Sequence, residues 1–106
     1  MLSKKKRVNK EVFQTLMKEG KPFVAQLFLF YSKKTPDSHF AFVAPKAIFK
    51  TAVKRNKFRR IGYNILRSIQ TKPVTGIFIY KKQAISANKE EIKDDVVFIL
   101  KKLNLI

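Results

Sequence analysis

The segment Pro22–Ser32, PFVAQLFLFYS, constrains the fold of this chain more than any other stretch. Successive side chains of a β-strand point to opposite faces of its sheet, and here both sets are almost entirely apolar. Such a strand has to be central in the sheet or covered on both faces. We therefore expect a long, buried strand over 22–32.

Two further strands are predicted. The segment KKTPDS is a turn, and it leads into a strand over His39–Ala44, which we expect to run antiparallel to the first and to end at Pro45. The segment TKPVTG leads into a third expected strand over Val74–Tyr80.

The first helix is predicted over Lys10–Glu19. Asn9 can cap its N-terminus, and Val8 and Phe13 occupy the two positions of a hydrophobic staple. Gly20 suits the left-handed position that often ends a helix.

The second helix is predicted from about Lys50 to Ile69. Its apolar positions form one stripe at the helical period, namely Phe58, Ile61, Gly62, Ile65, Leu66 and Ile69. Lys54 and Arg55 interrupt this stripe, so either the first turns project beyond the core or packing there follows Ala52 and Val53. The opposite side holds Asn56, Arg60, Tyr63, Asn64 and Arg67.

The last helix begins after Asn88, which with Glu91 can form a capping box, and it extends to about Lys102. Its expected buried face consists of Ile92, Val96, Val97, Leu100 and Leu103. The predicted order is αββαβα in a single domain over 1–106, and residues 1–8 form a basic, flexible arm.

Charge gives the strongest indication of a partner. The chain has 24 Lys and Arg against 7 Asp and Glu, a formal net charge of +17, and twelve basic but no acidic residues between Ser38 and Lys89. Nucleic acid is the leading partner, and an anionic membrane surface is the weaker alternative. The longest apolar run, Leu27–Tyr31, is too short to span a bilayer, so we expect a cytoplasmic protein without membrane insertion.

The residues offer little for catalysis by the protein alone. With no Cys, the chain has no thiolate metal site. The single His39 fits a structural or surface role better than acid–base chemistry. The pairs Glu90/Glu91 and Asp94/Asp95 fall in the first turns of a helix. There they are better explained as charges that complement the helix dipole than as ligands of a metal ion.

The segment from Lys46 to Arg60 is better suited to binding, since it carries seven cations in fifteen residues. Lys supplies a point charge to phosphate, and the planar guanidinium group of Arg can donate two hydrogen bonds to it. Asn56 can donate and accept hydrogen bonds at once, so it can orient an Arg or contact a ribose or base edge. A helix face that is merely solvated is the weaker interpretation. Such a face would carry Glu or Asp four residues before or after its Lys and Arg residues, and this one does not.

Most of the ten Phe residues are expected in the core. Phe13, Met17 and Tyr31 are the exceptions, as candidates for an open patch between the first helix and the sheet. Single-stranded RNA could stack on such a patch, although a core role for these three residues is nearly as well supported.

The segment FKTAVKRNKFRR resembles the signature of the bacterial ribonuclease P protein component, an Ala-Val-x-Arg-Asn-x-x-(Lys/Arg)-Arg pattern. Its positions are filled by Ala52, Val53, Arg55, Asn56, Arg59 and Arg60. The segment EVFQTLMKEG is similar to the family's Asp-Phe-x-x-(Val/Leu)-(Phe/Tyr)-x-x-Gly. The order of predicted elements and the length agree over nearly the whole chain.

This resemblance implies an α+β fold, an αββαβα two-layer sandwich similar to the second domain of ribosomal protein S5. It also implies a left-handed βαβ crossover, where pattern alone would favour a right-handed one. The implied function is the protein subunit of ribonuclease P, a monomer in a 1:1 ribonucleoprotein that removes 5′ leaders from precursor tRNA. The RNA subunit would perform the hydrolysis and hold most of the Mg²⁺, while the protein binds the leader.

The expected site residues follow from the signature and from the charge. Those expected to contact RNA are Lys46, Lys50, Lys54, Arg55, Asn56, Lys57, Arg59, Arg60 and Arg67. Those expected to line the leader cleft are Phe13, Met17 and Tyr31. This chain departs from the family at Met17, often Phe or Tyr, at Ala47, often Lys, and at Tyr63 and Asn64, often Arg-Glu.

Two other functions remain open. A ribosomal or other structural RNA-binding protein without a cleavage role would share the composition, and only the Arg55–Asn56 signature argues against it. A free-standing nuclease would need clustered acids, which the basic middle of the sequence lacks.

Overall fold

The computed structural model describes residues 10–20 and 22–106. Along the chain its elements are α1 (Lys10–Glu19), β1 (Phe23–Val24), β2 (Phe28–Lys33), β3 (His39–Val43), α2 (Ala52–Arg67), β4 (Thr75–Tyr80), the short 3-10 helix η2 (Lys82–Ser86) and α3 (Lys89–Lys102). The three predicted helices and the strands β3 and β4 are confirmed to within about two residues. The arm 1–8, the Asn9 cap and the Val8 half of the staple fall outside the described residues.

The prediction of one long strand over 22–32 is wrong. The segment forms two strands, and β1 turns back to pair antiparallel with β2 in the register Phe23↔Phe30. The turn is closed by a hydrogen bond of 2.9 Å from the Ala25 N–H to the Phe28 carbonyl oxygen. The chain therefore has one strand more than the predicted αββαβα order.

Distant residues hold this turn in place. The Leu27 N–H donates to Oδ2 of Asp95 in α3 at 3.0 Å. The Lys81 ammonium donates to the Ala25 carbonyl oxygen at 2.9 Å. Because both partners lie more than fifty residues away in sequence, no local pattern within 22–32 could have indicated the break.

The four strands form one sheet in the order β1-β2-β4-β3. β2 is antiparallel to β4, and β3 is parallel to β4, with Tyr31 and Ala41 both opposite Ile77. The strand over 39–43 therefore runs antiparallel to β2, as predicted, but its neighbour is β4. Because β3 and β4 are parallel neighbours joined through α2, they form a βαβ unit.

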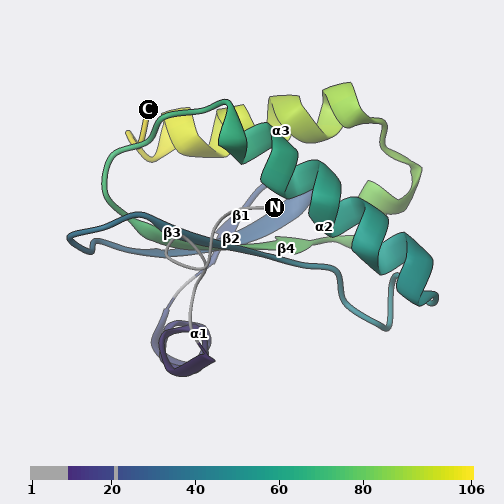
Figure 1. Ribbon diagram of the computed structural model, residues 1–106, viewed down its shortest axis with the longest axis horizontal. Coiled ribbons are helices and arrows are strands. Elements are labelled where there is room, and N and C mark those ends of the chain that lie inside the picture. The colour runs from purple at the N-terminus through teal and green to yellow at the C-terminus, as the bar shows by residue number, and fades with distance from the viewer. Residues whose placement is uncertain (1–9, 21) are drawn as a thin grey trace.

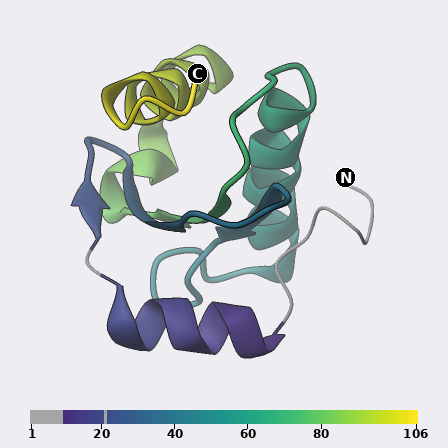
Figure 2. The same ribbon diagram turned by 90° about the vertical axis from the view of Figure 1, so that its left-hand side faces the viewer.

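The two faces of the sheet are covered differently. Helices α2 and α3 lie together over one face, and α1 lies alone across the other (Figures 1 and 2). The covered face, under α2 and α3, carries the aromatic side chains Phe28, Phe30, Phe40, Phe42, Phe78 and Tyr80. The open face, toward α1, carries the alternate residues Leu29, Tyr31, Ala41, Val43, Ile77 and Ile79.

Helix α2 packs along its predicted stripe. Phe58, Gly62 and Leu66 are buried. A Cβ on Gly62 would lie 2.4 Å from the Phe42 ring, so only glycine allows the helix this close to the sheet. At the N-terminal end Val53 is 78% exposed, which confirms that the first turns project beyond the core.

Tyr63 was predicted on the outward side of α2, and the structure shows that this prediction is wrong. It is buried, its ring meets the Phe42 ring edge-on at 5.2 Å, and its hydroxyl accepts the Phe42 N–H at 3.2 Å. At this departure from the family pattern, the tyrosine joins the core and satisfies a backbone group of β3.

Helix α3 begins with the predicted capping box, in which Asn88 and Glu91 exchange hydrogen bonds of 2.9 and 3.1 Å. Its buried face includes the predicted Ile92, Val96 and Leu100 and also Ile99. Within the part of the chain that the structure describes, no helix is long and apolar enough to cross a membrane.

Candidate nucleic-acid interface

The signature segment forms the loop before α2 and the first turns of that helix. Thr51 caps the helix, and its Oγ1 accepts the Lys54 N–H at 3.2 Å. No acidic residue occurs in the first turn. The positive end of the helix dipole and the exposed lysine side chains therefore act together on any nearby anion.

The loop is anchored by an aromatic side chain. Phe49 is 1% exposed, and its ring lies 4.6 Å from that of Phe58 and 5.7 Å from that of Tyr80. Lys46 and Lys50 flank this anchor in sequence and are exposed. A buried residue thus holds two flexible cations at the start of the helix.

Arg55 differs from the other signature cations. Its side chain is half-buried, and Nη1 donates to the Phe49 carbonyl oxygen at 2.8 Å. Part of its guanidinium group is therefore used to fasten the loop to the helix. The remaining donors are available to an RNA phosphate.

Asn56 has a defined partner within the signature. Its Oδ1 accepts a hydrogen bond from Nη2 of Arg59, one turn along the helix. Of the two roles that the sequence left open, the structure therefore shows the orienting one. A guanidinium held in this way loses less entropy when it binds a phosphate.

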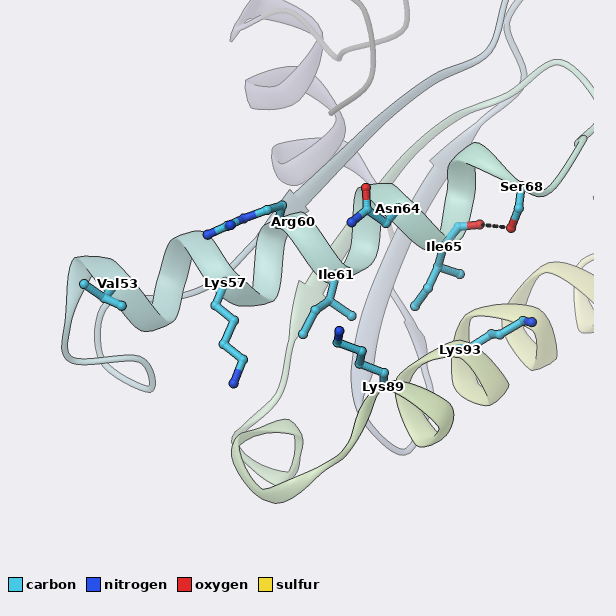
Figure 3. Close-up of a pocket in the computed structure, with 9 residues that line it drawn as sticks. All are labelled: Val53, Lys57, Arg60, Ile61, Asn64, Ile65, Ser68, Lys89 and Lys93. Carbon is cyan, nitrogen blue, oxygen red and sulfur yellow. Dashed lines mark hydrogen bonds between the residues drawn. The ribbon is translucent and has the colours of Figure 1, made fainter.

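The expected RNA-binding residues are spread over the length of α2. Lys54, Asn56, Lys57, Arg59 and Arg60 are exposed on its first half, and Arg67 is exposed at its end. In Figure 3 Lys57 extends into the gap between α2 and α3, whereas Arg60 lies along the other side of α2. Both line a hollow to which α3 contributes Lys89 and Lys93. Sequence reasoning did not include these two lysines, although their spacing of four residues puts them on one side of a helix.

The predicted leader patch lies on the open face. Phe13, Met17 and Tyr31 are all half-buried, whereas Leu16 between them on α1 is 5% exposed. A Cβ added to Gly20 would lie 3.2 Å from the Tyr31 ring, so the end of α1 rests against that tyrosine. The three side chains pack against the fold and still present surface to solvent.

The next row on the open face is polar. Lys33, Thr75 and His39 are aligned across β2, β4 and β3. The Thr75 hydroxyl oxygen lies 3.0 Å from that of Thr35. His39 is half-buried beside them.

Asp95 is the buried carboxylate of α3, at 8% exposure, while its neighbour Asp94 is exposed. Burial raises the pKa of the Asp95 carboxyl group, and hydrogen bonds from the backbone of residues 26 and 27 partly offset this effect. Asp95 therefore holds the β1–β2 turn, a role that the dipole interpretation of the Asp94/Asp95 pair missed.

Tyr80 fastens α2 to the sheet from the covered face. Its hydroxyl donates to the Phe58 carbonyl oxygen at 2.6 Å, and burial raises the pKa of the phenol. Residues 10–20 and 22–106 contain no group of three His, Cys, Asp or Glu side chains that could hold a metal ion. The Tyr80 hydroxyl thus serves to position α2 against the sheet.

Comparison with known proteins agrees with this architecture. The family model for ribonuclease P matches residues 2–104, and no curated protein sequence matches the chain. A solved mutant of the Staphylococcus aureus RNase P protein, described as defective in mRNA degradation activity, has a TM-score of 0.84 at 20% identity, over 97% of this chain and 92% of that one. For the Thermotoga maritima RNase P protein the TM-score is 0.79 at 22% identity, over 91% and 96%. The structural likeness shows the fold, and the family model spans nearly every residue: this chain belongs to the ribonuclease P protein family.

Proposed function

We propose that this chain is the protein subunit of ribonuclease P, and that it binds both the catalytic RNA and the 5′ leader of precursor tRNA. Family membership places the chain in tRNA processing. The finer roles rest on the surface that the fold presents to RNA.

The observation that carries the proposal is the basic outer side of α2. Lys54, Lys57, Arg59 and Arg60 are exposed there, and no acidic residue occurs between Ser38 and Lys89. Helix α2 therefore supplies no acidic side chain to balance these cations, and a phosphate backbone would neutralise them with release of counterions. In this proposal α2 contacts the catalytic RNA near its active site, and Arg59 is held in position by Asn56.

The leader would bind on the open face. Phe13, Met17 and Tyr31 are half-buried there, so they are fixed by packing and can still offer a stacking surface. Bases of a single strand stack on such side chains without a strong sequence preference. At Met17 a thioether replaces the ring that many members carry, so packing on a base would be weaker at that position.

The hydrolysis itself would belong to the RNA, with Mg²⁺ held mainly by RNA groups. The protein would contribute affinity and orientation as a monomer in a 1:1 cytoplasmic ribonucleoprotein.

Reconstitution tests the proposal. The full chain is mixed with a bacterial ribonuclease P RNA, and precursor tRNA cleavage is measured at limiting Mg²⁺. We expect the protein to increase the cleavage rate, because added cations reduce the Mg²⁺ needed for charge neutralisation. RNA binding without any gain in cleavage would favour a structural RNA-binding protein, and cleavage by the protein alone would favour a nuclease.

A further inference from the structure

A basic hollow of about 570 Å³ lies between α2 and α3, on the outer side of the layer that covers the sheet (Figure 3). Ile61 and Ile65 contribute its apolar wall. Its lining includes four cations and no acid. The full lining is Val53, Lys57, Arg60, Ile61, Asn64, Ile65, Ser68, Lys89 and Lys93.

A second hollow adjoins the first. The neighbouring hollow, of about 350 Å³, reaches Lys54 and Ile85 and shares Lys57, Ile61 and Lys89 with the first. The two hollows adjoin along α2 around these shared side chains, and together we call them the α2–α3 channel. Val53 and Ile85, at 78% and 43% exposure, lie along it as uncovered apolar side chains. Exposed apolar surface in a concave, charged site is typical of a ligand-binding surface.

Basic and acidic side chains of α3 line different hollows. Lys89 and Lys93 line the channel, whereas Glu91, Asp94 and Asp95 line a different hollow on the side of β1. Glu91 is also engaged by its capping hydrogen bond with the Asn88 N–H. Lys57 and Lys89 extend into the gap between the two helices, while Arg60 and Lys93 line the same hollow without pointing across it (Figure 3). Gathering four like charges around one hollow is unfavourable until an anion binds.

We propose that the α2–α3 channel binds a single-stranded segment of RNA, with phosphates between its two cationic walls and a base against Ile61 and Ile65. The two adjoining hollows are lined by five cations in all, which favours a strand with several phosphates over one small anion. The apolar wall favours unpaired bases, since a duplex presents mainly phosphate and sugar. Asn64 offers a donor and an acceptor at the channel edge, and the Ser68 hydroxyl, which donates to the Ile65 carbonyl oxygen at 2.9 Å, keeps its acceptor capacity.

This inference deepens the proposed function and rests on it for RNA as the partner. It adds Lys89 and Lys93 to the surface defined by the signature. It also puts this contact and the leader patch on opposite sides of the sheet, because α1 lies across the face away from α2 and α3 (Figure 2).

The test uses the full chain with labelled isoleucine methyl groups and a hexauridylate probe. Hexauridylate should shift the methyl signals of Ile61 and Ile65, while inorganic polyphosphate of equal charge should shift them much less. The double variant K89A/K93A should weaken hexauridylate binding on the order of tenfold and reduce the slope of log affinity against log salt by about 1.4, at roughly 0.7 per phosphate contact. The matched control K101A/K102A removes two exposed lysines from the last turn of the same helix and should change affinity less than about twofold.

Several results would overturn the inference. They are unmoved isoleucine signals, equal shifts with polyphosphate, equally tight binding of uridine triphosphate, or equal losses in the two double variants. Cleavage by the reconstituted enzyme is measured in parallel. An active enzyme whose channel signals do not respond would refute the channel and leave the proposed function intact.

Discussion

Phe30 and Tyr31 are neighbours in β2, yet they belong to two very different surfaces. Phe30 points to the covered face and is 1% exposed, with its ring 4.4 Å from that of Phe78. Tyr31 points to the open face, where α1 alone covers the sheet, and it is half-buried. The covered face of the sheet thus holds the stabilising core, while the open face keeps an aromatic side chain partly accessible to solvent.

The aromatic network of the covered face explains this division. Phe42 stacks on Phe78 at 4.7 Å with an interplanar angle of 7°, and Phe28 meets Phe78 edge-on at 5.4 Å. On the open face Ile77 is fully buried, while Tyr31 and Ala41 on either side of it are half-buried. Helix α1 packs mainly against β2, and as the one described helix on this face it leaves Tyr31 and Ala41 partly exposed.

The largest expected effect separates the two neighbours in β2. Phe30→Ala should lower the free energy of unfolding by about 3–5 kcal/mol, the usual cost of removing a buried ring. Tyr31→Ala should cost much less, because its ring is partly solvated. Chemical denaturation of both variants measures the difference, and equal losses would contradict the division of the sheet into covered and open faces.

On the outer side of α2, one arginine substitution should affect RNA binding alone, and another should affect both RNA binding and stability. Arg60→Ala should weaken RNA affinity by about 1.5–3 kcal/mol, as for a lost charge-assisted hydrogen bond, and leave unfolding unchanged. Arg55→Ala should lower both the RNA affinity and the free energy of unfolding, because Arg55 also donates to the Phe49 carbonyl oxygen.

Filter binding and thermal unfolding of the two arginine variants give the comparison. A fully stable Arg55→Ala protein would show that the loop contact is unimportant. An unchanged RNA affinity in Arg60→Ala would contradict the role of the outer side of α2.

Two adjacent aspartates extend the comparison to α3. Asp95→Ala should cost about 1–3 kcal/mol of stability, because it leaves the buried Leu27 N–H without its acceptor. Asp94→Ala, at an exposed position, should stay within about 0.5 kcal/mol of the parent. If denaturation midpoints moved equally in both, the turn would not depend on Asp95.

The smallest expected effect is a dependence on pH. Burial raises the pKa of Asp95 above its ordinary value of 3.8, so between the unfolded and folded pKa values the native state binds more protons. The contribution of this carboxyl group to stability is therefore largest below pH 3.8 and falls as pH rises through the folded pKa. The unfolding free energy of Asp95→Asn, minus that of the parent, should increase over this window and be flat elsewhere; a decrease would mean that the pKa is lowered.

Much of the fold was predictable because its signals are local. The capping box at Asn88 and the stripe of α2 depend on residues within a few positions of one another. The helix α1 also ends before Gly20 as predicted, although this glycine does not adopt the left-handed conformation expected of it. The break within 22–32 was not predictable, since Asp95 and Lys81 impose it from distant elements. The buried position of Tyr63 was missed because the sequence gives no measure of how closely Gly62 lets α2 approach Phe42.

The candidate site shows the same limit. The cations of α2 were evident from the sequence, because the signature is continuous. Lys89 and Lys93 were not associated with them, because only the packing of α3 beside α2 brings the two helices together (Figure 1). Arg55 was treated as equivalent to its neighbours, and its loop contact is visible only in three dimensions.

The central claim is that the open face binds the leader, and one measurement tests it directly. Affinity for precursor tRNA and for mature tRNA is compared in the reconstituted enzyme with the parent chain, Phe13→Ala and the control Phe98→Ala, which removes a 51% exposed ring from α3. We expect Phe13→Ala to reduce the preference for the leader-bearing substrate by about 1 kcal/mol or more, as for a lost base–aromatic stack, while Phe98→Ala leaves it unchanged. Equal losses for both substrates in Phe13→Ala would show that this ring only packs the fold, and would contradict the account.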